Sequence, residues 1–156
     1  MRHHPKLAWT RLLLFSVFIA VNAHTKSPVA SFSKYPISIS LKRVGQYPAL
    51  AKSGGGYFYD EVLEYRVWVH PGGDDYYKAF ATFEEAKSFS IQTLKAEEPI
   101  VLVLQHEHVN EPKQGTFEYV KGDRITEWRI EWLEGKKRTP TSIPDFLKQH
   151  SIPRSK

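Results

Sequence analysis

The sequence contains no cysteine. This absence excludes a disulfide-stapled scaffold, thiolate zinc sites, iron–sulfur clusters and a cysteine nucleophile. A long apolar run is missing as well: the longest spans residues 12–21 and includes a serine. A helix needs about 20 apolar residues to cross a bilayer. The folded part of the chain must therefore be held together by packing and polar contacts alone.

A strong excess of one charge is absent from most of the chain. The full sequence has 22 Lys and Arg against 17 Asp and Glu, a formal net charge of +5. Three of the basic residues (Arg2, Lys6 and Arg11) and none of the acidic ones lie in residues 1–23. The remaining 133 residues carry 19 basic and 17 acidic side chains, a balance of +2. Such a balance does not indicate a dedicated nucleic-acid binder, so no nucleic-acid partner is expected.

The N-terminus has the layout of a secretory signal peptide. Its basic residues precede the apolar run 12–21, and Val21-Asn22-Ala23 supplies small residues before a cleavage site. We predict that residues 1–23 are a signal peptide and that the protein works in the periplasm or outside the cell. The alternatives are an uncleaved anchor, which would be the protein's sole contact with a membrane, and a buried core helix.

The rest of the chain divides into three parts by composition. Residues 24–56 are rich in Ser, Lys, Pro and Gly and read as a flexible lead-in, with an edge strand possible at 37–41. Residues 57–150 are densely patterned and predict one α+β domain, and 151–156 are a tail. Apolar residues at 41% and aromatic residues at 13% argue against disorder.

The predicted fold is a mostly antiparallel five-stranded sheet with one main helix packed on a face and a short C-terminal helix. The strands are expected at 62–70, 76–81, 99–109, 116–121 and 124–133, with a hairpin turn at Gly122-Asp123. Thr82 to Glu85 form a capping box that starts the main helix. Its sheet-facing stripe is expected to consist of Phe83, Ala86, Phe89 and Leu94.

Residues 62–70 alternate between two faces. Leu63, Tyr65, Val67 and Val69 form the apolar face, and the opposite face carries an arginine, a tryptophan and a histidine. Such a set predicts a ligand surface. The expected ligand-binding residues are Arg66, Trp68, His70, Tyr57, Tyr59 and Asp74. In the alternative interpretation, residues 37–56 fold over this face and make it a second small core.

A metal site is a further hypothesis. His106 and His108 are two residues apart on a predicted strand, so both imidazoles point the same way and could bind one metal ion. The third ligand would come from His70, Asp74, Asp75 or Glu118. The alternative is that both histidines are solvated at the end of the strand. No cofactor is expected, because the sequence has no phosphate loop, HExxH, GxGxxG or nucleophile elbow.

Residues 56–147 resemble a family of small bacterial proteins of unknown function. The resemblance is carried by Gly56-Tyr57-Phe58-Tyr59-Asp60, Leu63 to Pro71, Asp74-Asp75-Tyr76-Tyr77, Thr126-Glu127-Trp128 and Ile143-Pro144-Asp145-Phe146-Leu147. Members are often labelled N-acetyltransferases of the general N-acetyltransferase (GNAT) superfamily, so the resemblance implies acetyl transfer. The chain lacks the Gln/Arg-x-x-Gly-x-Gly/Ala segment whose amides hold acetyl-CoA in those enzymes.

Two functional hypotheses follow. The first is a non-enzymatic module that binds a small molecule or another protein through the face of Arg66 and Trp68. The second is an enzyme: an N-acetyltransferase, as the family label implies, or a metal-dependent hydrolase that uses His106 and His108.

Overall fold

The computed structural model describes residues 33–53 and 55–151. The predicted signal peptide therefore lies outside the described residues. One compact unit, Phe32–Lys156, holds all the described secondary structure. In chain order its elements are η1 (Leu41–Arg43), β1 (Lys52–Ser53), β2 (Glu61–Val69), β3 (Tyr76–Phe80), α1 (Phe83–Gln92), β4 (Ile100–Lys113), β5 (Thr116–Arg129), η2 (Ile130–Leu133) and α2 (Ser142–His150).

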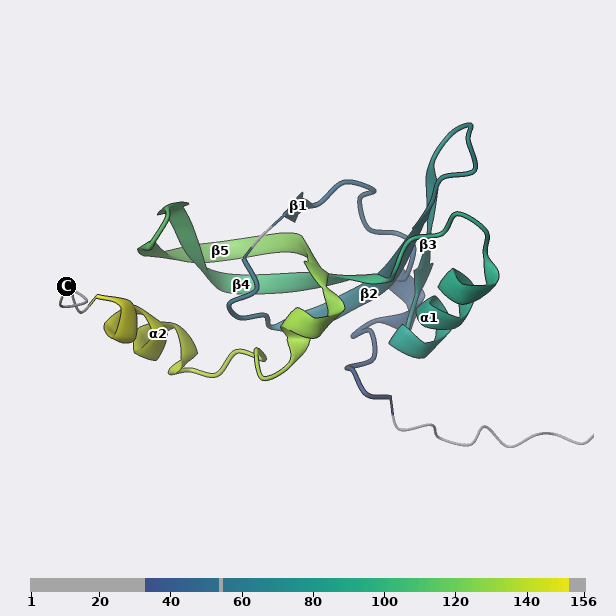
Figure 1. Cartoon of the computed structure of the whole chain (residues 1–156). Helices are drawn as coiled ribbons and strands as arrows, with labels where there is room; N and C mark the ends of the chain where they lie inside the picture. Colours follow the sequence, from purple (N-terminus) through teal and green to yellow (C-terminus); the bar gives the residue numbers. More distant parts are fainter. Residues whose placement is uncertain (1–32, 54, 152–156) are drawn as a thin grey trace, which may run out of the picture. The chain divides into compact units, whose positions relative to one another are not determined.

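The fold is α+β, as predicted, with an antiparallel sheet and two helices. Strand β4 lies at the centre between β2 and β5, and β3 pairs with the other edge of β2. The two-residue β1 lies parallel to β5 at the opposite edge of the sheet. Figure 1 shows the long β4–β5 hairpin with α2 beside its far end, and α1 beside β2 and β3.

The predicted hairpin at Gly122-Asp123 is wrong, because 116–121 and 124–129 belong to one strand, β5. The hairpin turn lies instead between Lys113 and Thr116. At Gly122 the strand has a bulge: Gln105 pairs with Arg124 and Glu107 with Lys121, so β5 has one more residue than β4 over this stretch. Gly122 has a φ of 138°, which only glycine adopts readily. Beyond Arg129 the chain turns into η2 rather than continuing the strand to residue 133.

A second bulge lies in β2. Val62 pairs with Val103 and Glu64 with Leu102, so Leu63 is an extra residue in β2. Leu63 consequently packs in a different hydrophobic cluster from Tyr65 and Val67, although alternation predicted that the three share one face. A pattern of strict period two cannot show such an insertion.

The larger core lies between one face of the sheet and α1 with η2. Its fully buried members include Tyr65, Val67, Val101, Val103 and Trp128. The capping box predicted for α1 is confirmed, since Thr82 Oγ1 accepts from Glu85 N and the Glu85 side chain accepts from Thr82 N.

Two local expectations near this core differ from the structure. Ala86 is buried, and Phe83 and Phe89 pack against the core, but Leu94 is 86% exposed. Helix α1 ends at Gln92, so Leu94 no longer follows the helical period. Residues 37–40 form no strand, because their contacts are single bonds: Ser38 N donates to Ala81 O and Ile39 N to Val62 O.

The opposite face of the sheet is covered by residues 45–51, which we expected to be part of a flexible lead-in. Tyr47 is 5% exposed and packs with Leu63 and Leu102. Gly45 N donates to Glu64 Oε2 at 2.7 Å. This packing is the arrangement that the alternative interpretation of the sequence describes.

Arg66 connects this segment to the sheet. Its side chain is fully buried, with Nε 2.7 Å from Glu64 Oε1 and Nη1 2.8 Å from Glu127 Oε1. Its Nη2 donates to Pro48 O at 2.6 Å and its Nη1 to Ala49 O at 3.1 Å. A buried guanidinium with four hydrogen bonds is compensated for its loss of water.

Helix α2 packs on the far half of β5. Phe146 lies with its ring 5.0 Å from the rings of both Phe117 and Tyr57. The predicted start of this helix at Ser142 is confirmed. Within the described ranges, the helices are too short or too polar to cross a membrane.

We expect Arg66→Ala to destabilise the protein by about 3–5 kcal/mol, the usual cost of leaving a buried ion-pair partner uncompensated. Glu64 would keep its burial and lose its cation. Urea unfolding followed by tryptophan fluorescence would measure the change. The matched control is Arg129→Ala, whose side chain is 73% exposed and lies 3.8 Å from Glu131. Removal of such a surface pair costs about 0–1 kcal/mol. Equal losses in the two variants would contradict this account of Arg66.

Candidate functional site

The structure separates the six predicted ligand-binding residues. Arg66 and Trp68 remain together through Tyr77: the Arg66 guanidinium carbon lies 4.6 Å from the centre of the Tyr77 ring, and the Trp68 ring lies 5.0 Å from it. Arg66 is covered by residues 48 and 49 and has no exposed surface. Its contacts in the structure are therefore those of a packed side chain.

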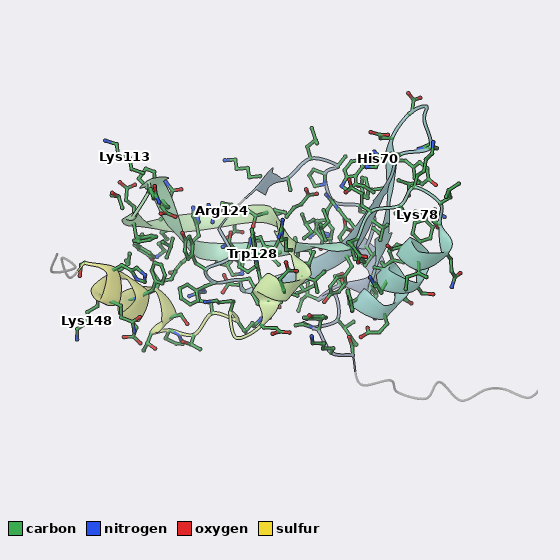
Figure 2. The ribbon with its side chains drawn as sticks, in the orientation of Figure 1. His70, Lys78, Lys113, Arg124, Trp128 and Lys148 are labelled. Carbon is green, nitrogen blue, oxygen red and sulfur yellow. The ribbon has the colours of Figure 1, made fainter. Side chains whose placement is uncertain are left out.

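The other four residues lie elsewhere. Tyr59 is buried in the larger core against Trp128, and Tyr57 joins the aromatic cluster beside α2, where its hydroxyl donates to Glu111. Asp74 is exposed in the turn between β2 and β3. His70 lies at the same end of the sheet, away from the Arg124 and Trp128 labelled in Figure 2.

His70 joins two loops through both ring nitrogens. Nδ1 lies 2.9 Å from Asp75 Oδ2, and Nε2 lies 2.9 Å from Glu97 Oε1. Ionised carboxylates only accept, so both contacts are hydrogen bonds only when the ring is an imidazolium with a hydrogen on each nitrogen. The hydrogen bond to Asp75 is the largest cause that raises the pKa of His70, and the hydrogen bond to Glu97 is the second.

His106 and His108 have different surroundings. His106 is exposed, and its Nδ1 lies 2.7 Å from Asp123 Oδ1, a contact that raises its pKa. His108 is only 9% exposed. Among residues 33–53 and 55–151, no three His, Asp or Glu side chains gather in a way that could hold a metal ion.

A cavity of about 420 Å³ lies over the β5 bulge. It is lined by the covering segment (Pro48, Leu50, Ala51 and Lys52), by His108 of β4, and by Val120, Asp123, Arg124 and Ile125 of β5. Its volume falls within the range of about 300–1,000 Å³ that is usual for small-molecule sites. We call it the bulge cavity.

The bulge in β5 places Val120 and Ile125, which lie on either side of it, on the same face of the strand. Val120 and Ile125 are five residues apart, so a regular strand would place them on opposite faces. The extra residue at Gly122 reverses the alternation, and both side chains line the bulge cavity. The same reversal turns Tyr119 toward the other side, where it lines a second cavity with Ile143 and Leu147.

Arg124 is the unusual cation of the bulge cavity. It is half-buried, its Nε donates to Gln105 Oε1 at 2.9 Å, and its Nη2 is buried without a hydrogen-bond partner among the described residues. The other well-buried arginines have carboxylate partners: Arg66 contacts Glu64, and Arg138 contacts Asp60 at 2.7 Å. No described carboxylate lies within ion-pair distance of Arg124. Burial lowers its pKa.

His108 lies in the same wall. Its Nδ1 is also buried without a partner in the described part of the chain. Burial is the largest cause that lowers the pKa of His108, and the charge of Arg124 acts in the same direction, while a hydrogen bond with the Gly122 backbone acts against them. The environment of His108 therefore favours the neutral imidazole. Two residues of one cavity wall that each hold a buried nitrogen without a partner are uncommon, because buried polar groups are nearly always hydrogen-bonded.

Our sequence reasoning identified His108 but missed Arg124 and Lys52. One signal was legible: Arg124 precedes Thr126 and Trp128 at intervals of two, which places an arginine on the apolar face of a strand. The sequence did not predict that Lys52 lies beside Arg124, because this proximity depends on the parallel pairing of β1 with β5 across more than 70 residues.

Comparison with known proteins identifies no relative: no family model, curated protein or solved structure matches this chain. The resemblance drawn from the sequence therefore stays a prediction.

We expect His70 to stabilise the fold in a pH-dependent way. Its pKa is raised in the folded protein above the unfolded value of about 6.5. Its contribution is therefore fully present below about pH 6.5 and is lost as the pH rises through the folded pKa. Urea unfolding of wild type and His70→Gln should show the largest stability difference at low pH. Asp75→Asn should reduce this difference, and Asp74→Asn, beside it, should not. A difference that grows above pH 7 would contradict the prediction.

Proposed function

We propose that this protein is a non-enzymatic module that binds a small molecule in the bulge cavity, and that it does so outside the cytoplasm. The observation that carries the proposal is that Arg124 and His108 line one cavity and that each side chain holds a nitrogen (Nη2 and Nδ1) without a hydrogen-bond partner among the described residues. A bound molecule with polar atoms would supply partners to these side chains. Buried groups that are unsatisfied cost about 1–3 kcal/mol each, so their pairing favours binding.

The second cavity, beneath α2, offers less to a ligand. Its charged residues already pair with each other or with neighbours: Arg138 contacts Glu107 at 3.2 Å and Asp60 at 2.7 Å. Its volume is about 260 Å³, and half of its lining residues are proline, isoleucine or leucine. The bulge cavity is larger and has polar groups left to satisfy, which favours it as the site.

The enzymatic alternatives find less support in the geometry. A hydrolase that used His106 and His108 would need both imidazoles at one metal ion, yet His106 contacts Asp123 at the surface while His108 is buried. An acetyltransferase would need the phosphate-binding turn that the sequence lacks. Export remains part of the proposal on the strength of residues 1–23 alone.

We expect small polar molecules to raise the melting temperature of the purified protein, because a ligand that binds the native state alone stabilises it. A thermal-shift panel of carboxylates, phosphates, sugars and amino acids would test this. Acetyl-CoA and Zn²⁺ belong in the panel as tests of the enzymatic alternatives. A ligand at 100 times its Kd stabilises by about 2.7 kcal/mol, which is readily detected.

The location is tested with two tryptophan variants of adjacent residues. Val120→Trp adds bulk to the wall of the bulge cavity and should abolish the shift, whereas Tyr119→Trp lies in the wall of the cavity beneath α2 and should preserve it. The reverse pattern would move the site beneath α2. If no panel member stabilises the protein, the proposal fails. A shift with acetyl-CoA or Zn²⁺ alone would favour an enzyme.

A further inference from the structure

We infer that the bulge cavity selects a small molecule with one oxyanion group, a carboxylate or a phosphate, at the Arg124 guanidinium, and a short apolar body against the residues of the covering segment. This inference rests on the proposed function and adds the chemical class of the ligand. Arginine is the side chain best suited to oxyanions, because its planar donors match the spacing of two oxygen atoms.

The charges of the cavity favour an anion. Lys52 and Arg124 line it together with one carboxylate, Asp123. Asp123 is already engaged by His106 Nδ1 at 2.7 Å, and neither Lys52 nor Arg124 has an ion-pair partner among the described residues. Lys52 is exposed to solvent, whereas Arg124 is half-buried, so Arg124 is the cation that lacks compensation in a site partly shielded from water. A half-buried guanidinium is ordinarily paired, because the loss of its hydration is costly.

His108 adds no charge beside the oxyanion. A neutral imidazole carries one hydrogen, and the hydrogen bond of the ring with the Gly122 backbone uses it. The donors to the oxyanion therefore come from Arg124. A cationic ligand would meet Lys52 and Arg124 as like charges, which disfavours it.

The other residues that line the bulge cavity indicate what the rest of the ligand is. Pro48, Leu50, Ala51, Val120 and Ile125 contribute apolar surface around the polar end. Leu50 is 86% exposed, so a ligand that covers it removes apolar area from water. A short alkyl or aromatic body suits this wall better than a sugar, whose hydroxyls would find few partners there.

The test uses matched ligands on the full-length purified protein. Isothermal titration calorimetry would compare hexanoate, hexyl phosphate and hexanamide, which share one alkyl chain and differ in the charged group. We expect one of the anions to bind at least about tenfold more tightly than the amide, the ratio that a charge-assisted hydrogen bond supplies. The tighter of the two anions then identifies carboxylate or phosphate as the source of the oxyanion.

The variants assign this discrimination to Arg124. Arg124→Met should remove the preference for the anion while the amide binds as before, and Arg129→Met, on the exposed end of the same strand, should preserve it. Lys52→Met gives a second measurement if Arg124→Met fails to fold: it should lower the preference for the anion. Equal affinity for anion and amide would overturn the inference and leave the proposed function standing. If neither anion nor amide binds, and the wider panel gives no shift, both fail.

Discussion

The burial of one guanidinium organises the second face of this protein. Arg66 lies in the middle of the sheet, where its charge can be tolerated only with a full set of acceptors. Glu64 of the same strand and Glu127 of β5 supply two of them, and the carbonyls of residues 48 and 49 supply the others. The polar contacts to this one side chain add to the packing of Tyr47 in holding the covering segment. Residues 50–52, at the end of the segment, form the outer wall of the bulge cavity, so this cavity depends on Arg66 although Arg66 does not line it.

Arg66 and Arg124 differ in how their charge is compensated. Arg66 has carboxylates on both sides and the ring of Tyr77 above it, and it is closed to solvent. Arg124 has one amide oxygen, that of Gln105, and a cavity. A sequence does not distinguish these situations, because both residues stand at alternating positions of strands. The partners that make one structural and leave the other open to a ligand come from segments distant in the chain.

Short sequence patterns predicted the features of the fold that depend on neighbouring residues. The capping box of α1, the start of α2 at Ser142 and the α+β class all follow from short-range signals and agree with the structure. The bulges at Gly122 and Leu63 did not follow, because an inserted residue reverses the alternation on one side of it and leaves a sequence that still looks regular. Gly122-Asp123 therefore predicted a turn, and Leu63 was assigned to the wrong face. The convergence of Lys52, His108 and Arg124 is beyond such patterns, since it requires the register of three strands.

The bulge at Gly122 also has a consequence for how related sequences should be read. The extra residue reverses the alternation of side chains between the two halves of β5. Before the bulge, the even-numbered Val120 lines the bulge cavity and the odd-numbered Tyr119 lines the cavity beneath α2; after the bulge, the odd-numbered Ile125 lines the bulge cavity. A homologue that lacked one residue at this point would align almost perfectly and would still exchange the inward and outward side chains of a whole half-strand. A single-residue gap in an alignment would then mark the loss of two features together, the ligand wall and the seat of the C-terminal helix.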